Sequence, residues 1–186
     1  MRRAVLACVL TAALVLAAGA PAAASGGLTA VSSRFGSADG AYTYDTTAVP
    51  GSARAWVLAA SGPSASGPGW TGVVLYVRGL LPRHEYGAHV HVNACGPAGP
   101  DAGPHYQHVV DPVQPSVDPA YANPRNEIWL DFTTDRWGTG GSAALVPWRF
   151  GARRPGSVVL HAMHTHTAPG EAGTAGARLA CVTVPF

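Results

Sequence analysis

The chain has 186 residues, with 12 Lys and Arg against 10 Asp and Glu, and a formal charge of +2 at pH 7. This length suits one domain with a packed core and is short for two. The near balance of charges, and the lack of any run of basic residues, argues against a nucleic-acid or membrane-surface partner. The composition leaves the oligomeric state open.

The N-terminal segment, residues 1–24, is predicted to be a signal peptide. Arg2 and Arg3 supply a positive start, and an apolar run and then small residues suited to cleavage follow. The run is shorter than the roughly 20 residues that span a bilayer, so a retained anchor is the less favoured alternative. Cys8 falls within the discarded peptide. We therefore expect an exported protein, secreted or associated with the cell envelope, whose single domain is residues 25–186.

The rest of the chain predicts an all-β fold. It combines many Gly and Pro residues with short apolar runs, and no stretch combines a helical period with capping signals. Gly-Pro clusters at 62–69 and 97–104 indicate turns and loops. The predicted strands, in chain order, are 29–34, 41–48, 53–60, 70–78, 86–93, 126–133, 141–149, 156–162 and 177–184.

Two long segments, residues 94–125 and 163–176, lack a strand pattern and are rich in turn residues. Long loops in a compact β domain are usually functional when they are ordered. These two flank most of the eight histidines of the chain. These two loops are therefore the segments where we look for functional residues.

Cys95 and Cys181 are the two cysteines that follow the signal peptide. An even count in an exported protein predicts one disulfide. Closing a loop of this size would stabilise the fold by about 4–5 kcal/mol in the chain-entropy model. Thiolate ligands for copper are the alternative, which a reducing compartment would suit better.

Seven of the eight histidines form three clusters, and each cluster lies at a strand end or in a loop. His89 and His91 are two apart on a predicted strand, so both imidazoles project from one face. His105 lies in the first long loop with His108 close by, and His161 closes an apolar strand. Imidazole suits zinc, copper, iron and nickel, and a set of four nitrogens favours copper(II).

Five segments, taken in order along the chain, match motifs of one known family. Residues 87–91 (Gly-Ala-His-Val-His) resemble a Gly-Phe-His-Val-His motif, and Cys95 follows at the place of that family's first disulfide cysteine. Residues 103–106 (Gly-Pro-His-Tyr) resemble Gly-Pro-His-Phe, and residues 158–161 resemble the strand that carries a last copper histidine. Residues 173–181 (Gly-Thr-Ala-Gly-Ala-Arg-Leu-Ala-Cys) are close to the C-terminal signature Gly-Asn-Ala-Gly-Ser-Arg-Leu-Ala-Cys. Over residues 70–186 the chain therefore resembles the copper/zinc superoxide dismutases, as a secreted bacterial member.

The resemblance implies an eight-stranded Greek-key fold, a flattened β-barrel or sandwich with long metal-site loops. It also implies a copper site that converts superoxide to oxygen and hydrogen peroxide. The implied copper ligands are His89, His91, His105 and His161.

The same resemblance assigns roles to residues around the copper. Arg178 would attract and orient the anionic substrate. His105 would act in catalysis by carrying a proton as well as by binding the metal. Cys95 would pair with Cys181, which would tie the first long loop to the last strand.

The zinc half of the family's site has weak counterparts in this chain. His108 and Asp111 are the candidates for a second metal, but they lie much nearer to His105 than the family's spacing. The paired aspartates after the last copper histidine are replaced by Thr165 and His166. We favour a copper-only protein, in which His164 and His166 would serve as hydrogen-bond partners of the ligands. The alternative is a non-standard second site built from His108, Asp111 or His166.

Three functions compete. The leading hypothesis is an exported, copper-dependent superoxide dismutase. The second is a non-enzymatic module that binds copper or zinc on the same fold. The third is an adhesion module with incidental histidines, which would bind no stoichiometric copper.

Overall fold

The structure is a computed structural model that describes residues 27–36 and 40–186. The predicted signal peptide lies outside these residues. No helix in the described part of the chain is long and apolar enough to cross a membrane.

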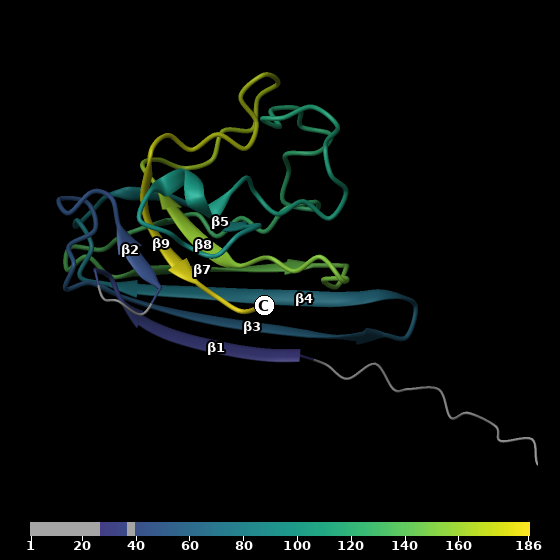
Figure 1. The fold of residues 1–186 in the computed structure, drawn as a ribbon, viewed down its shortest axis with the longest axis horizontal. Helices are drawn as coiled ribbons and strands as arrows, with labels where there is room; N and C mark the ends of the chain where they lie inside the picture. The colour runs from purple at the N-terminus through teal and green to yellow at the C-terminus, as the bar shows by residue number, and fades with distance from the viewer. Residues whose placement is uncertain (1–26, 37–39) are drawn as a thin grey trace, which may run out of the picture.

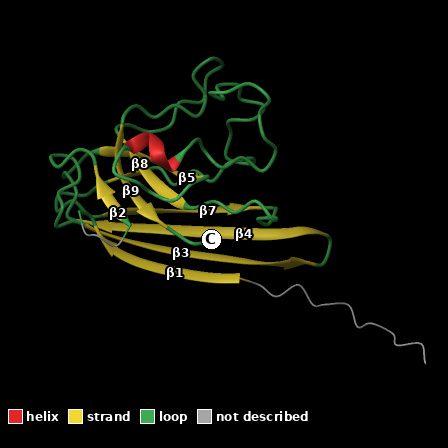
Figure 2. Ribbon diagram, viewed as in Figure 1, coloured by secondary structure: helices red, strands yellow, loops and turns green. Residues whose placement is uncertain are grey.

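The described residues form two antiparallel sheets that lie against each other as layers (Figures 1 and 2). The four-stranded sheet has the order β1 (Gly27–Arg34), β3 (Arg54–Ser64), β4 (Gly67–Arg78) and β7 (Gly140–Val146). The five-stranded sheet has the order β2 (Ala41–Thr43), β9 (Arg178–Thr183), β8 (Ser157–His161), β5 (Glu85–His91) and β6 (Phe132–Thr133). The predicted all-β class is therefore confirmed as a sandwich rather than a closed barrel. The described residues contain nine strands instead of eight when the two-residue β6 is counted.

The core lies between the sheets, and the two layers bury their strands differently. In β4, buried Val73 and Leu75 alternate with exposed Val74 and Tyr76. One face of the four-stranded sheet is therefore not covered by other parts of the protein. In β8 every residue is buried, because one face packs on the core and the other lies beneath the long loops. Its side chains therefore face either the apolar core or the underside of the loops, and the strand ends at His161.

Three predicted strand boundaries differ from the structure. The Gly-Pro cluster at 62–69 is part of a β3–β4 hairpin, with a register shift between Gly62 and Ser64. The second strand is short because the carboxylate of Asp45 accepts hydrogen bonds from Thr47 N and Ala48 N, which turns the chain. Most of 126–131 runs beside β5 without a continuous ladder, through two backbone bonds and one isolated bridge.

The two long loops follow the prediction apart from one 3-10 turn, Gly99–Ala102, and both lie over the five-stranded sheet (Figure 1). Gly87 of β5 allows the second loop to approach closely. A Cβ at this position would lie 2.5 Å from the carbonyl oxygen of Met163 and 2.6 Å from the Cβ of Ala175. The glycine at the start of the histidine motif is therefore required by packing.

Candidate metal centre

Four histidines from three separate segments meet in one cluster. His89 and His91 project from alternate positions of β5, and His161 ends the neighbouring strand β8. His105 joins them through an isolated β-bridge with His91. One ring nitrogen from each of the four histidines lies within 4.8 Å of those of the others. The structure therefore brings together the set of side chains that the sequence predicted.

In three of these histidines the outer ring nitrogen, Nδ1, faces an acceptor that carries no hydrogen. Nδ1 of His91 lies 2.9 Å from the carbonyl oxygen of Gly103, and Nδ1 of His161 lies 3.4 Å from that of Gly176. Nδ1 of His105 lies 2.8 Å from Oε2 of Glu127. Carbonyl and carboxylate oxygens only accept, so each Nδ1 carries the proton and each Nε2 keeps a lone pair.

In His89 the hydrogen-bonded nitrogen is Nε2 instead of Nδ1. Its Nε2 lies 2.6 Å from the hydroxyl oxygen of Thr165, and that hydroxyl donates to Oδ1 of Asp131 at 2.8 Å. The hydroxyl has only one hydrogen, so Nε2 of His89 donates and Nδ1 is left with the lone pair. This Nδ1 is fully buried and has no hydrogen-bond partner among the described residues.

Burial keeps the rings neutral. Desolvation lowers the pKa of His89 and of His91 well below the usual histidine value, and the neighbouring His105 lowers both further. Desolvation, followed by the effect of His105, lowers the pKa of His161 to about 3. At neutral pH these three imidazoles are therefore uncharged and offer lone pairs rather than protons.

The cluster fits a metal ion that prefers nitrogen ligands. Nε2 of His91 and Nε2 of His161 face each other at 3.4 Å, and the tautomers above place a lone pair on both. The unpartnered Nδ1 of His89 is a buried acceptor without a donor. A cation would satisfy all of these lone pairs at once, as in sites where each ligating histidine donates its other ring N–H to a fixed acceptor.

Glu127 is the buried carboxylate of this site, and the sequence analysis did not identify it. Oε2 accepts from Nδ1 of His105 and, at 2.6 Å, from Nε1 of Trp129, while Oε1 accepts from Nε2 of Gln107 at 2.8 Å. Three donors offset the cost of burying the charge. Nδ1 of His105, which faces away from the cluster, is therefore occupied by this carboxylate.

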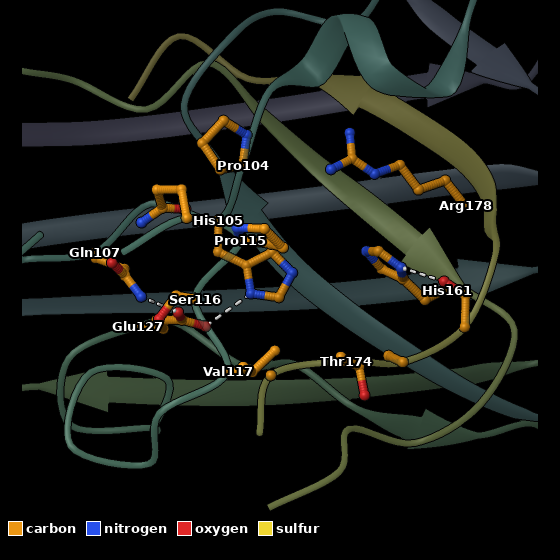
Figure 3. A pocket seen from close by; sticks show the side chains of 14 residues that line it. Pro104, His105, Gln107, Pro115, Ser116, Val117, Glu127, His161, Thr174 and Arg178 are labelled. Carbon is orange, nitrogen blue, oxygen red and sulfur yellow. Dashed lines mark hydrogen bonds and ion pairs between the residues drawn. The ribbon is translucent and has the colours of Figure 1, made fainter. Parts of the chain in front are cut away.

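Arg178 lies in the same cleft as two of the histidines (Figure 3). The cleft has a volume of about 380 Å³, and its wall includes His105, His161 and Arg178. Arg178 is the first residue of β9 and pairs with His161 across the sheet. Its guanidinium donates to the carbonyl oxygens of Gly99 at 2.8 Å and Gly103 at 2.7 Å, so its charge is held in place at the cleft.

The Cys95–Cys181 disulfide is formed, with a Cα–Cα distance of 5.7 Å, which confirms the predicted pairing. It ties the first long loop to β9 three residues after Arg178. Gly103 of that loop accepts from both Arg178 and His91. The backbone of Gly103 has a φ of 70°, and a Cβ there would lie 2.6 Å from Val92 Cγ2, so a glycine is needed to present this carbonyl.

The residues predicted for a second metal lie outside the cluster. The ring of His108 is exposed and stacks on Trp148, with centroids 4.8 Å apart. The carboxylate of Asp111 accepts from Val113 N and from the hydroxyl of Ser116. Only one group of three or more candidate ligands, the four-histidine cluster, occurs among residues 27–36 and 40–186.

The prediction that His164 and His166 support the ligands is wrong. Nε2 of His164 lies 3.1 Å from the carbonyl oxygen of Phe132, and Nδ1 of His166 pairs with Glu171 at 3.0 Å. Thr165, which lies between them, makes the contact with His89. His84 packs edge-on against Tyr86 and is half-buried, outside the cluster.

Comparison with known proteins does not establish a family. No family model matches the chain, and no curated protein matches it. Among solved structures, two mutants of a SOD-like protein from Bacillus subtilis are similar to it. The double mutant has 14% sequence identity, covers 68% of this chain and 86% of its own, and gives a TM-score of 0.47. The single mutant has 14% identity, covers 67% and 86%, and gives a TM-score of 0.48.

Proposed function

We propose that the protein is an exported superoxide dismutase that uses copper alone. The observation that carries the proposal is the four-histidine cluster, in which each ring offers one lone pair while its other nitrogen donates to a fixed acceptor. Four neutral nitrogens favour copper among the metals that imidazole binds. The motif resemblance of residues 70–186 points to the same chemistry.

Four side chains would hold the metal: Nδ1 of His89 and Nε2 of His91, His105 and His161. Bound copper would supply one-electron transfer in both directions, so that one superoxide is oxidised to oxygen and a second is reduced to hydrogen peroxide. Burial lowers the pKa of His89, His91 and His161, which keeps these three rings neutral and ready to bind. Thr165 and Asp131 hold the ring of His89 in the tautomer that presents Nδ1.

Arg178 would attract and orient the substrate. Two of its N–H groups are committed to the carbonyls of Gly99 and Gly103, which fixes the guanidinium at the cleft. A fixed positive charge at a concave surface raises the local concentration of small anions. The cleft of about 380 Å³ offers ample room for a diatomic anion.

His105 and Glu127 would supply a proton. His105 keeps a proton on Nδ1, which it donates to the buried carboxylate of Glu127. His105 lines the cleft together with Arg178, so a proton carried on its ring would lie within reach of the substrate.

Zinc is not needed for this scheme. Glu127 accepts from Nδ1 of His105, so this nitrogen has no lone pair to offer a second metal. His108 and Asp111, the weak candidates for such a metal, are engaged with Trp148 and with the turn at Ser116. Export through a signal peptide at residues 1–24 is part of the proposal, and the Cys95–Cys181 bond suits the oxidising compartment it would reach.

The test compares the exported protein with His161→Ala after both have been loaded with copper and dialysed. Stopped-flow decay of superoxide measures activity, while metal analysis and the copper EPR spectrum measure binding. We expect rapid decay and one tightly bound copper for the native protein, and loss of both for His161→Ala. His84→Ala is the matched control, since His84 lies outside the cluster.

Two results would contradict the proposal in different ways. Tight copper binding with no acceleration of superoxide decay would leave a metal-binding module. Failure to bind stoichiometric copper would remove the metal centre itself and favour an adhesion role.

A further inference from the structure

The outer face of the four-stranded sheet is apolar, although it faces solvent. Leu28 of β1 is 74% exposed, Val74 of β4 is 45% exposed and Leu145 of β7 is 73% exposed. Across three consecutive rows of side chains on this face, no residue is charged. Soluble monomers rarely expose a contiguous apolar surface of several hundred Å² without a partner.

The side chains of the two central strands, β3 and β4, differ in size from row to row along this face. The ladder between them pairs Ala60 with Gly72, Leu58 with Val74, and Trp56 with Tyr76. The first of these rows is therefore low, the second is intermediate and the third is high. The rings of Trp56 and Tyr76 support each other, with centroids 5.5 Å apart, so the high row is a stable ridge.

The two ends of this face differ in their side chains. Beyond the high row, Arg54 stands directly opposite Arg78. Beyond the low row at the other end, Trp70 is paired with Gly62 and packs over it, since a Cβ on Gly62 would lie 3.0 Å from the indole Nε1. The face therefore has a basic end and an aromatic end.

We propose that this face binds a second copy of the chain, related by a two-fold axis. The axis lies in the plane of the interface, perpendicular to the strands, and passes through the row of Leu58 and Val74. Each row then faces its counterpart at the opposite end, as in aligned packing of two sheets. Trp56 meets the partner's Ala60, and Tyr76 meets the partner's Gly72, so each ridge enters a hollow.

The edge strands follow the same rule. Leu28 pairs with Ala60 in the low row, and Ser32, four residues further along β1, pairs with Trp56 in the high row. On β7, Leu145 belongs to the low row and Gly141 to the high row. Under the two-fold axis, Leu28 faces the partner's Ser32 and Leu145 faces the partner's Gly141. Large side chains again meet small ones.

Charge selects this axis over the other arrangement. A two-fold axis parallel to the strands would set Arg54 against the partner's Arg78 and Trp56 against the partner's Tyr76, and like charges in contact oppose association. With the perpendicular axis, Arg78 lies over the partner's Trp70, where a guanidinium and an indole attract each other. Arginine and tryptophan are also the side chains that most often dominate binding energy at interfaces.

The area suits a specific dimer of modest affinity. Four strands about 4.8 Å apart, over three rows spaced about 6.8 Å, span roughly 400 Å² of sheet plane. Side chains that project from the plane increase the accessible surface, so two copies would bury about 1,000 Å², the lower end for a specific interface. We therefore expect a reversible dimer that dissociates on dilution.

Sedimentation equilibrium of the exported protein tests the dimer. Val74 lies next to the axis, so Val74→Lys places two ammonium groups near each other and should raise the dissociation constant at least tenfold. Val113→Lys is the matched control, because Val113 is 69% exposed on a distant loop, and it should leave the constant unchanged. Circular dichroism and thermal melting check that both variants fold.

Cross-linking tests the position of the axis. A short bismaleimide should join two copies of Leu58→Cys, whose positions meet at the axis. It should fail with Leu145→Cys. Under the proposed axis the two copies of this residue are separated by two rows, which is about 14 Å along the strands. A native protein that stays monomeric at its highest soluble concentration would overturn the proposal. Binding of the monomer to lipid vesicles through this face would also overturn it. A dimer that Val74→Lys leaves intact would do the same.

Discussion

The two sheets reach their structure in different ways. In the four-stranded sheet, β3 and β4 form one hairpin, and Ser64 pairs with Gly67 across its turn. In the five-stranded sheet the partners are distant in the chain, as when Ala41 pairs with Val182. The β3–β4 pair follows from alternation along a continuous segment, whereas β7 of the first sheet and most pairs of the second need the chain to close long loops before they form.

The burial of polar groups separates the two sheets further. The four clustered histidines lie on strands of the five-stranded sheet or on the loop that covers it, and Glu127 and Asp111 are buried nearby. The four-stranded sheet buries apolar side chains on one face and exposes them on the other. The chemistry of the protein is therefore concentrated where its structure depends most on long-range contacts.

The largest effect on this contrast should come from removing the disulfide. The Cys95→Ala/Cys181→Ala variant should lose about 4 kcal/mol of unfolding free energy, because the bond closes a loop with a sequence separation of 86. The loop carrying Gly103 should also loosen, which would weaken copper binding through His91. Urea unfolding and copper titration measure the two effects. Loss of stability without any change in copper affinity would show that the loop is held by other contacts.

Matched substitutions of valine to threonine compare the sheets directly. Val158→Thr places a hydroxyl in the core, where Val158 is 1% exposed, and should cost about 1–3 kcal/mol. Val74→Thr, on the outer face, should change the unfolding free energy by less than about 0.5 kcal/mol when measured on dissociated monomer. Chemical denaturation at low protein concentration measures both. Equal costs would contradict the difference in burial.

The Glu127→Gln variant should weaken copper binding. An amide in place of the carboxylate removes the charged acceptor of His105 Nδ1, and loss of such a partner typically lowers metal affinity about 10–100-fold. Competition with a chelator measures the affinity, and the EPR spectrum should shift if the ring of His105 changes its position. Asp118→Asn, on an exposed turn, is the control. An unchanged affinity would remove Glu127 from the metal centre.

Tyr86 should make the stability fall at high pH. Burial raises the pKa of Tyr86 to about 12, and its hydroxyl donates to the carbonyl of Ala48 at 2.6 Å. The folded state therefore holds the proton more tightly than the unfolded state, whose pKa is about 10. The stabilisation is complete below pH 10 and is lost as the pH rises towards 12.

The Tyr86→Phe variant isolates this contribution. It should lose about 1 kcal/mol at neutral pH, because the hydrogen bond to Ala48 is absent. Its stability should then decline less steeply than that of the native protein between pH 10 and 12, as followed by urea unfolding at each pH. Parallel curves for the two proteins would contradict the raised pKa.

Much of the candidate site could be predicted from the sequence. The alternation of His89 and His91 on a strand, and the histidines at the ends of neighbouring segments, indicated a shared site, and the structure gathers them within 4.8 Å. The supporting acceptors could not be predicted in the same way. Glu127 and Asp131 lie in an apolar segment, Glu-Ile-Trp-Leu-Asp, where two acids are unusual, and that contrast was the one signal available.

The sequence by itself determined the class of the fold, the ligand types and the Cys95–Cys181 pair, because strand alternation and residue chemistry are local properties. The tertiary structure alone decided which nitrogen of each histidine is available. Thr165 reaches His89 across 76 residues, and Glu127 reaches His105 across 22. It also decided that the outer sheet face carries matched low and high rows, since relief depends on how strands are registered. Both outcomes depend on pairing between distant segments, and local sequence pattern carries no information about which carbonyl, carboxylate or side chain will lie opposite.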